Sequence, residues 1–149
     1  MKLWMRPVPF VLAAGLLGLA APSAAQCEPD GDIGFVCGPI SPEDLALVPD
    51  SPWVIVSSWE PDGYLSAADS RDHGTIRLFP TDTSQARPDA ETYAACPGMT
   101  TDRFQSHGIS LRPGRDGRHT LYVVRHGDRE AVEVFEVDAR AGTPRLTWQ

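Results

Sequence analysis

The sequence predicts an all-β protein made of about two blades of a β-propeller, each blade being a small antiparallel sheet. Apolar and polar residues alternate along short segments that are bounded by turn residues. This pattern occurs twice, at about 43–82 and 107–138, and propeller blades span about 40 to 50 residues. No segment after residue 25 has the period of a long amphipathic helix. The alternative fold is an antiparallel sandwich of about six or seven strands.

The first 25 residues have the pattern of a secretory signal peptide. Lys2 and Arg6 form a basic start, residues 8–20 form an apolar run, and Ser23-Ala24-Ala25 is a small-residue cleavage site. The run is shorter than the roughly 20 residues that cross a bilayer. We therefore expect no transmembrane segment, a mature domain at 26–149, and a secreted or periplasmic location.

The charge of the mature chain limits its partners. Residues 26–149 hold 11 basic and 20 acidic residues, a formal charge of −9. Such a charge opposes binding to nucleic acid and to anionic membranes. It is compatible with calcium and with small neutral substrates, and equally with an ordinary soluble surface.

Three cysteines, at positions 27, 37 and 96, remain in the mature chain. An exported compartment would oxidise them, and an odd number leaves one without a partner. The sequence leaves open a Cys27–Cys37 pair, a Cys37–Cys96 pair, or a partner on another segment.

Each copy of the repeat is expected to form at least three antiparallel strands. A Pro/Asp/Thr-rich connection, residues 81–101, is expected to be loop with room for one edge strand. Two blades leave sheet edges unpaired, so we expect the chain to be a fragment of a larger propeller. The expected strands are 43–49, 53–58 and 76–82 in the first copy, matched to 107–113, 121–126 and 132–138 in the second.

A histidine stands at each open end of one predicted hairpin. Residues 106–113 and 121–126 read as its two strands, joined by a polar turn at 114–118. Antiparallel pairing would make His107 and His126 neighbours, a candidate proton-handling pair. Glu43 has the position of His107 in the first copy, so both would converge at one mouth of a propeller channel. The alternatives are a structural histidine and, for Glu43-Asp44, a solvated pair at a strand start.

Several of these segments together resemble a known family. In order and with compatible gaps, the chain resembles the N-terminal part of the paraoxonase/arylesterase family over about residues 37–138. The matching segments are Cys37-Gly38-Pro39-Ile40-Ser41-Pro42-Glu43-Asp44-Leu45, residues 54–58, Gly74-Thr75-Ile76, His107-Gly108-Ile109-Ser110, residues 122–126 and residues 132–135.

The resemblance implies a six-bladed propeller that hydrolyses esters and lactones with calcium in its channel. It implies that Glu43 is a ligand of the catalytic calcium. Asp44 and the backbone carbonyl of Ile109 would belong to a second, structural calcium. His107 would be the general base acting on water, and His126 would orient it or relay its proton. Calcium takes six to eight oxygen ligands and polarises an ester carbonyl.

The sequence departs from the family in two ways. Arg125 stands where the family usually has asparagine, and the chain contains no asparagine, although the family completes its catalytic calcium site largely with asparagines from later blades. It also lacks the Gly-x-Ser-x-Gly, His-Glu-x-x-His and Cys-x-x-Cys motifs of serine hydrolases and zinc sites.

The expected function is therefore the N-terminal portion of a secreted calcium-dependent arylesterase or lactonase. We expect it to be inactive by itself until C-terminal blades or self-association complete its two calcium sites. The alternative is a non-catalytic propeller or sandwich module that binds another protein through an open edge.

Overall fold

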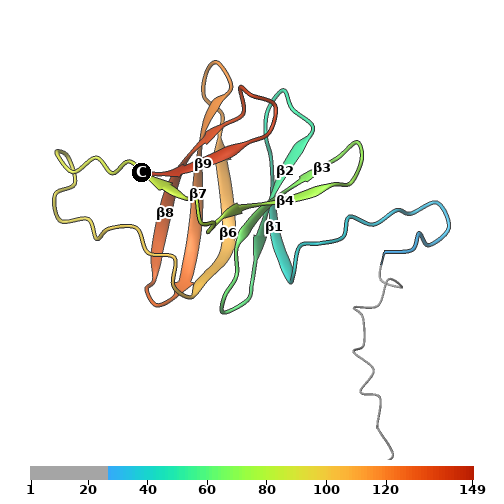
Figure 1. The fold of residues 1–149 in the computed structure, drawn as a ribbon, viewed down its shortest axis with the longest axis horizontal. Coiled ribbons are helices and arrows are strands. Elements are labelled where there is room, and N and C mark those ends of the chain that lie inside the picture. Colours follow the sequence, from blue (N-terminus) through green and yellow to red (C-terminus); the bar gives the residue numbers. More distant parts are fainter. Residues whose placement is uncertain (1–26) are drawn as a thin grey trace, which may run out of the picture.

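A computed structural model describes residues 27–149 of the chain. The expected signal peptide, residues 1–25, lies outside the described residues. Within them the chain forms nine strands in two sheets and no helix (Figure 1), which confirms the all-β class. Residues 27–149 contain no helix that is long and apolar enough to cross a membrane.

The first sheet is a simple antiparallel meander. Its four strands lie in chain order, β1 beside β2, β2 beside β3 and β3 beside β4. Polar turns join each strand to the next, which favours pairing between sequence neighbours. The strands are β1 (Pro42–Leu47), β2 (Trp53–Ser58), β3 (Leu65–Asp69) and β4 (Thr75–Phe79).

The second sheet is also a meander, with one added edge strand. β6, β7, β8 and β9 pair antiparallel in chain order, and the short β5 pairs parallel with β9 at the outer edge. The predicted hairpin is confirmed as β6–β7, and the connection 81–101 is loop apart from β5. The strands are β5 (Gln85–Ala86), β6 (Phe104–Arg112), β7 (Arg118–Gly127), β8 (Ala131–Asp138) and β9 (Arg145–Trp148).

The core lies between the two sheets. Ile55 and Leu65 of the first sheet and Leu121 of the second are fully buried there. The ring of Phe79 meets the rings of Phe104 and Phe135 edge to face, with centroids 4.9 Å apart in each case. Edge-to-face packing is a favoured geometry for aromatic pairs, so these three rings join the sheets across the interface.

The sequence did not reveal strand β3, and this changes the alignment of the repeat. Its Leu-Ser-Ala-Ala-Asp sequence has low strand propensity, yet all five residues are buried. The third strand of the first copy is therefore β3. Our match of 76–82 with 132–138 was wrong, because 132–138 lies in β8, the third strand of the second sheet, whereas 76–79 lies in β4, the fourth strand of the first.

An Asp-x-Arg motif marks the corrected match. Asp69 ends β3 and Asp138 ends β8, and in both the arginine two residues later folds back on the aspartate. The Arg71 backbone N–H and Nε donate to Asp69 Oδ1, and its Nη2 donates to Oδ2 at 2.6 Å. Arg140 makes the same three contacts with Asp138. The two sheets thus share a four-strand antiparallel meander with the same motif at the end of its third strand.

The two copies face in the same direction along the stack. Asp69 shares the face of Ala67, which packs in the core between the sheets. Asp138 lies on the opposite face of its strand from buried Val137, and so turns away from the first sheet. Equivalent faces therefore do not meet each other, and the first sheet packs head to tail on the second.

These ion pairs predict acid sensitivity. The hydrogen bond from the Arg71 side chain lowers the pKa of Asp69 to about 2, and the Arg140 side chain likewise lowers the pKa of Asp138. A carboxyl whose pKa is depressed on folding stabilises the fold above its unfolded pKa of about 3.9, and this contribution disappears as pH falls through the folded value. The free energy of unfolding should therefore decrease from pH 4 to pH 2.

Urea unfolding of the parent, Asp69→Asn and Asp138→Asn across that range measures the effect. Each variant should be less stable than the parent at pH 5, and the difference should shrink at pH 2. Asp32→Asn, at an exposed position, is the control. The assignment is contradicted if the free energy of unfolding of the Asp69→Asn, Asp138→Asn double variant decreases between pH 4 and pH 2 as much as that of the parent.

The structure also selects among the cysteine pairings. Cys27 and Cys37 form a disulfide with Cα atoms 6.0 Å apart, and Cys96 is a free, exposed thiol. The disulfide ties the start of the described chain to the segment that leads into β1.

Candidate functional site

Glu43, His107 and His126 come together at one end of the two-sheet stack. Glu43 is near the start of β1, His107 is in the first half of β6, and His126 is near the end of β7. β1 and β6, the first strands of the two copies, contact each other. The structure therefore brings together three of the residues that the sequence analysis singled out, from two separate sheets.

Each histidine pairs with its own carboxylate. Nε2 of His107 lies 3.0 Å from Oε1 of Glu43, and Nδ1 of His126 lies 2.5 Å from Oε2 of Glu130. If each of these nitrogens carries the proton and donates, the lone pairs are left on Nδ1 of His107 and Nε2 of His126. Nε2 of His126 is buried and has no hydrogen-bond partner. A buried polar atom in that state suits a bound water or a ligand.

The histidines are close, as the hairpin predicted, but they are not register partners. His126 lies opposite Gln105, and the ladder shifts between Ser106 and Ile109. This bulge contains His107, whose ring centroid is 5.6 Å from that of His126. Bulges often redirect side chains beside functional sites. Here the bulge turns His107 toward the Glu43 carboxylate.

Asp44 holds the bulge in place. Its Oδ2 accepts a hydrogen bond from the Ile109 backbone N–H at 2.8 Å, and its Oδ1 accepts one from the Leu45 N–H. Asp44 thus links β1 directly to β6. The contact that joins Asp44 and Ile109 runs through the amide nitrogen of Ile109.

A buried serine joins the sheets just below the histidines. Ser106 is fully buried, and its Oγ accepts a hydrogen bond from the Ser58 N–H at 2.9 Å and donates to the carbonyl of Tyr64 at 3.1 Å. Hydroxyls satisfy backbone groups that would otherwise be buried without partners. Ser106 therefore fixes the end of β2 against β6, where the site lies.

Two members of the site, Trp59 and Glu130, were not predicted from the sequence. The Trp59 ring centroid lies 4.4 Å from that of His107 and 5.1 Å from that of His126, so one indole contacts both imidazoles. Trp59 comes directly after β2, and 42% of it is exposed. The aromatic residue after the Ser57-Ser58 strand end and the carboxylate four residues after His126 were the available signals.

Arg125 points away from the histidines, into the protein. Adjacent strand residues point to opposite faces, so the neighbour of His126 lies between the sheets, and its side chain is fully buried. Its guanidinium donates to the carbonyls of Thr100 and Asp102 and to the carboxylates of Asp128 and Glu133. Its role is to anchor the loop before β6 and the turn after β7.

Glu133 is the centre of this buried network. It is nearly inaccessible, and it accepts hydrogen bonds from Arg125, from Arg129 and from the Trp148 indole N–H at 2.6 Å. Gly127 completes the support, because its φ is +112° and a Cβ there would collide with the Arg103 carbonyl oxygen. The chain after His126 is therefore firmly positioned.

Metal ligands are sparse in residues 27–149. No group of three or more His, Cys, Asp and Glu side chains in that part of the chain is arranged to hold a metal ion. Both carboxylate oxygens of Asp44 already accept backbone N–H groups. Glu43 and Asp44 were the two carboxylates expected to bind calcium. Of these two, Glu43 is the one whose oxygens accept no hydrogen bond from a backbone N–H within residues 27–149.

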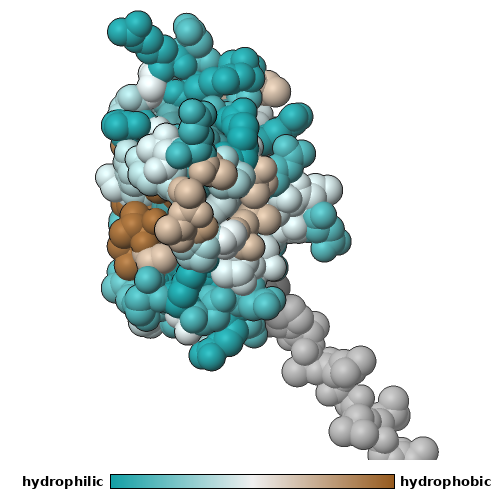
Figure 2. All heavy atoms as spheres, turned by 90° about the vertical axis from the view of Figure 1, so that its left-hand side faces the viewer, coloured by the Kyte–Doolittle hydropathy of each residue, from teal (hydrophilic) through white to brown (hydrophobic). Residues whose placement is uncertain are grey.

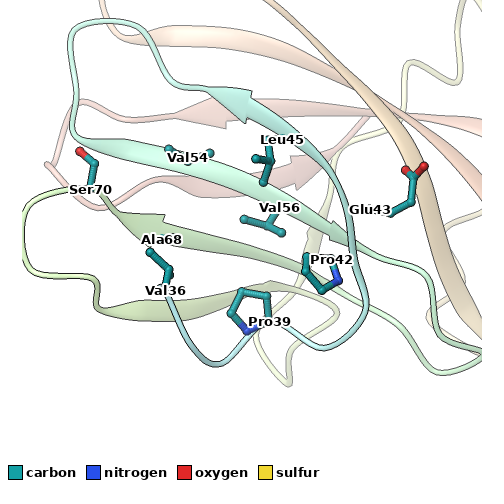
Figure 3. A pocket seen from close by; sticks show the side chains of 9 residues that line it. All are labelled: Val36, Pro39, Pro42, Glu43, Leu45, Val54, Val56, Ala68 and Ser70. Atoms are coloured by element: carbon teal, nitrogen blue, oxygen red, sulfur yellow. The ribbon is translucent and has the colours of Figure 1, made fainter. Parts of the chain in front are cut away.

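A hollow on the outer face of the first sheet adjoins the site. Its wall is apolar apart from Glu43 and Ser70, and Figure 3 shows that Glu43 stands apart from the apolar side chains. The hollow is lined by Val36, Pro39, Pro42, Glu43, Leu45, Val54, Val56, Ala68 and Ser70.

Comparison with known proteins adds no relative: no protein-family model, no curated protein and no solved structure matches the chain.

Proposed function

We propose that this chain is the N-terminal portion of an exported, calcium-dependent arylesterase or lactonase similar to the paraoxonase/arylesterase family. The observation that carries the proposal is the meeting of Glu43, His107 and His126 at the junction of two sheets, with Nε2 of His107 3.0 Å from the Glu43 carboxylate. These are the residues to which the resemblance assigns the chemistry.

The head-to-tail stacking of the sheets supports a propeller. In a propeller, each blade packs the same face against the next blade, and equivalent strands line the channel. The opposite orientation of Asp69 and Asp138 relative to the interface, and the contact between β1 and β6, are what this arrangement requires. A sandwich whose halves faced each other would instead bring equivalent faces together.

The chemistry proposed for the histidines follows from their protonation. With Nε2–H of His107 held by Glu43, Nδ1 is free to take a proton from water while the water oxygen forms a bond to the acyl carbon. When the intermediate collapses, the bond from the acyl carbon to the alcohol oxygen breaks, and His107 returns the proton to that oxygen. His126, whose ring centroid lies 5.6 Å from that of His107, would orient His107 or relay its proton.

The donor set of the described residues does not fit a calcium ion on its own. Calcium takes about six to eight oxygen ligands, whereas the Asp44 oxygens are engaged by amides and Glu43 is paired with His107. In the proposal the remaining oxygen ligands come from later blades. Calcium bound at the completed site would stabilise the oxyanion, which is usually a large part of catalysis.

An assay of the chain alone and of the chain joined to the blades that complete the propeller tests the function. At concentrations where it is a monomer, the short chain should not hydrolyse phenyl acetate or a simple lactone above background, even with millimolar calcium. The completed protein should hydrolyse one of them, lose the activity to a calcium chelator and regain it with calcium. Hydrolysis that the chelator leaves unchanged would overturn the family assignment.

The Cys27–Cys37 disulfide supports export, because disulfides persist mainly in oxidising compartments. We propose that the mature chain is secreted or periplasmic and starts close to residue 26. N-terminal sequencing of the exported protein checks this, and a mature chain that begins at Met1 would contradict it.

A second candidate function is a non-catalytic module that binds another protein. Exposed apolar residues on the outer sheet faces favour it, among them Leu47 and Val132. The two candidates differ in the assay above, since a binding module would give no chelator-sensitive hydrolysis after completion of the fold.

A further inference from the structure

We propose that the two outer sheet faces of this chain bind each other head to tail between copies, so that the first sheet of one copy packs on the second sheet of the next. The proposal concerns surfaces on the far sides of the two sheets and does not depend on hydrolase activity.

The outer face of the first sheet is apolar across two strands. Leu45 lies opposite Val56, and Leu47 lies opposite Val54, all four on the side that turns away from the core. Leu45 is 64% exposed and Leu47 is 75% exposed. Large aliphatic side chains that are this exposed and adjacent mark an interaction surface more often than isolated ones do.

The outer face of the second sheet has a matching composition. Val124 lies opposite Val132, and Tyr122 lies opposite Val134. Val132 is 61% exposed and Val124 is 38% exposed. Figure 2 looks onto this side of the molecule and shows an apolar cluster framed by hydrophilic residues. Tyr122, Val132 and Val134 form one wall of a hollow that is also lined by the loop residues Pro88, Tyr93 and Pro97.

The stacking inside the chain shows how such faces are covered. Asp69 faces the interface between the sheets, whereas its counterpart Asp138 faces away from it. The inner face of the first sheet is therefore equivalent to the outer face of the second sheet. The face by which the second sheet receives the first is equivalent to the outer face of the first. A second copy that packs its first sheet on this second sheet would therefore repeat the contact already made within the chain.

This geometry gives a heterologous interface. Such an interface uses two different patches, and each added copy leaves one patch of each kind free until a ring closes. An isologous dimer would bury the same patch on both partners. The two cases respond differently to substitutions on one face.

The test uses the full chain, with Leu47→Glu altering only the first outer face and Val132→Glu altering only the second. In sedimentation velocity over a concentration series, the parent should form species larger than a monomer, and each variant should be a monomer at concentrations where the parent assembles. An equimolar mixture of the two variants should form a dimer and nothing larger, because one intact patch of each kind remains.

Ala141→Glu, an exposed position in the turn after β8, adds the same charge and should assemble like the parent. Circular dichroism and thermal unfolding verify that the variants fold, and Leu45→Glu and Val124→Glu form a second pair if either does not. The proposal is overturned by a parent that stays monomeric, by a mixture that stays monomeric, or by one variant that dimerises alone. A monomeric parent would leave the hydrolase proposal standing, because later blades could cover the same faces.

Discussion

Replacing Arg125 with methionine is expected to destabilise the chain by about 3–5 kcal/mol, the range seen when one partner of a buried ion pair is removed. The Arg125 side chain is fully buried, and its guanidinium lies over the Phe104 ring, 5.1 Å from the centroid. Methionine fills much of the volume but donates no hydrogen bond. The carbonyls of Thr100 and Asp102 would lose a buried donor, and Glu133 would lose one of its cations.

Urea unfolding of the parent, Arg125→Met and Glu133→Gln measures this loss. Glu133→Gln should also destabilise the fold, since Glu133 accepts from two arginines and from Trp148. Arg115→Met, at an exposed position in the hairpin turn, is the matched control and should change stability by no more than about 0.5 kcal/mol. An Arg125→Met variant within about 1 kcal/mol of the parent would show that the network contributes little to stability.

Replacing His107 with glutamine is expected to lower hydrolysis by the completed protein by about 10²- to 10⁴-fold, the usual contribution of a general base. Glutamine keeps a polar side chain of similar length beside Glu43 but has no nitrogen that takes a proton from water. The loss should fall on kcat and leave KM little changed, because the proton transfer belongs to the chemical step.

His73→Gln is the matched control, because His73 is exposed and is not one of the site residues. Glu43→Gln should lower the rate as well, because Glu43 holds the Nε2–H of His107. Equal rates for His107→Gln and His73→Gln would remove His107 from the proposed mechanism. Circular dichroism of each variant separates loss of activity from loss of fold.

Much of the site was predictable because it depends on one local hairpin. The β-branched residues of 121–126 and the Gly/Arg/Asp turn predict β6–β7, and antiparallel pairing then brings His107 near His126. The bulge that separates their register was not predictable from this pattern. Its stabilising contact, from Asp44 to the Ile109 N–H, joins residues 65 positions apart in the sequence.

The sequence by itself determined the all-β class, the hairpin with its two neighbouring histidines, and the loop at 81–101, since these follow from alternation and turn chemistry over short distances. Only the tertiary structure decided the rest. β3 became a strand because its small residues are buried between neighbours, and Arg125 became an anchor because the loop before β6 and the turn after β7 supply its acceptors. The head-to-tail order of the sheets was likewise decided by which face each sheet buries. Which face of a strand is covered, and by which partner, depends on residues far apart in the chain, whereas local periodicity shows only which residues share a face.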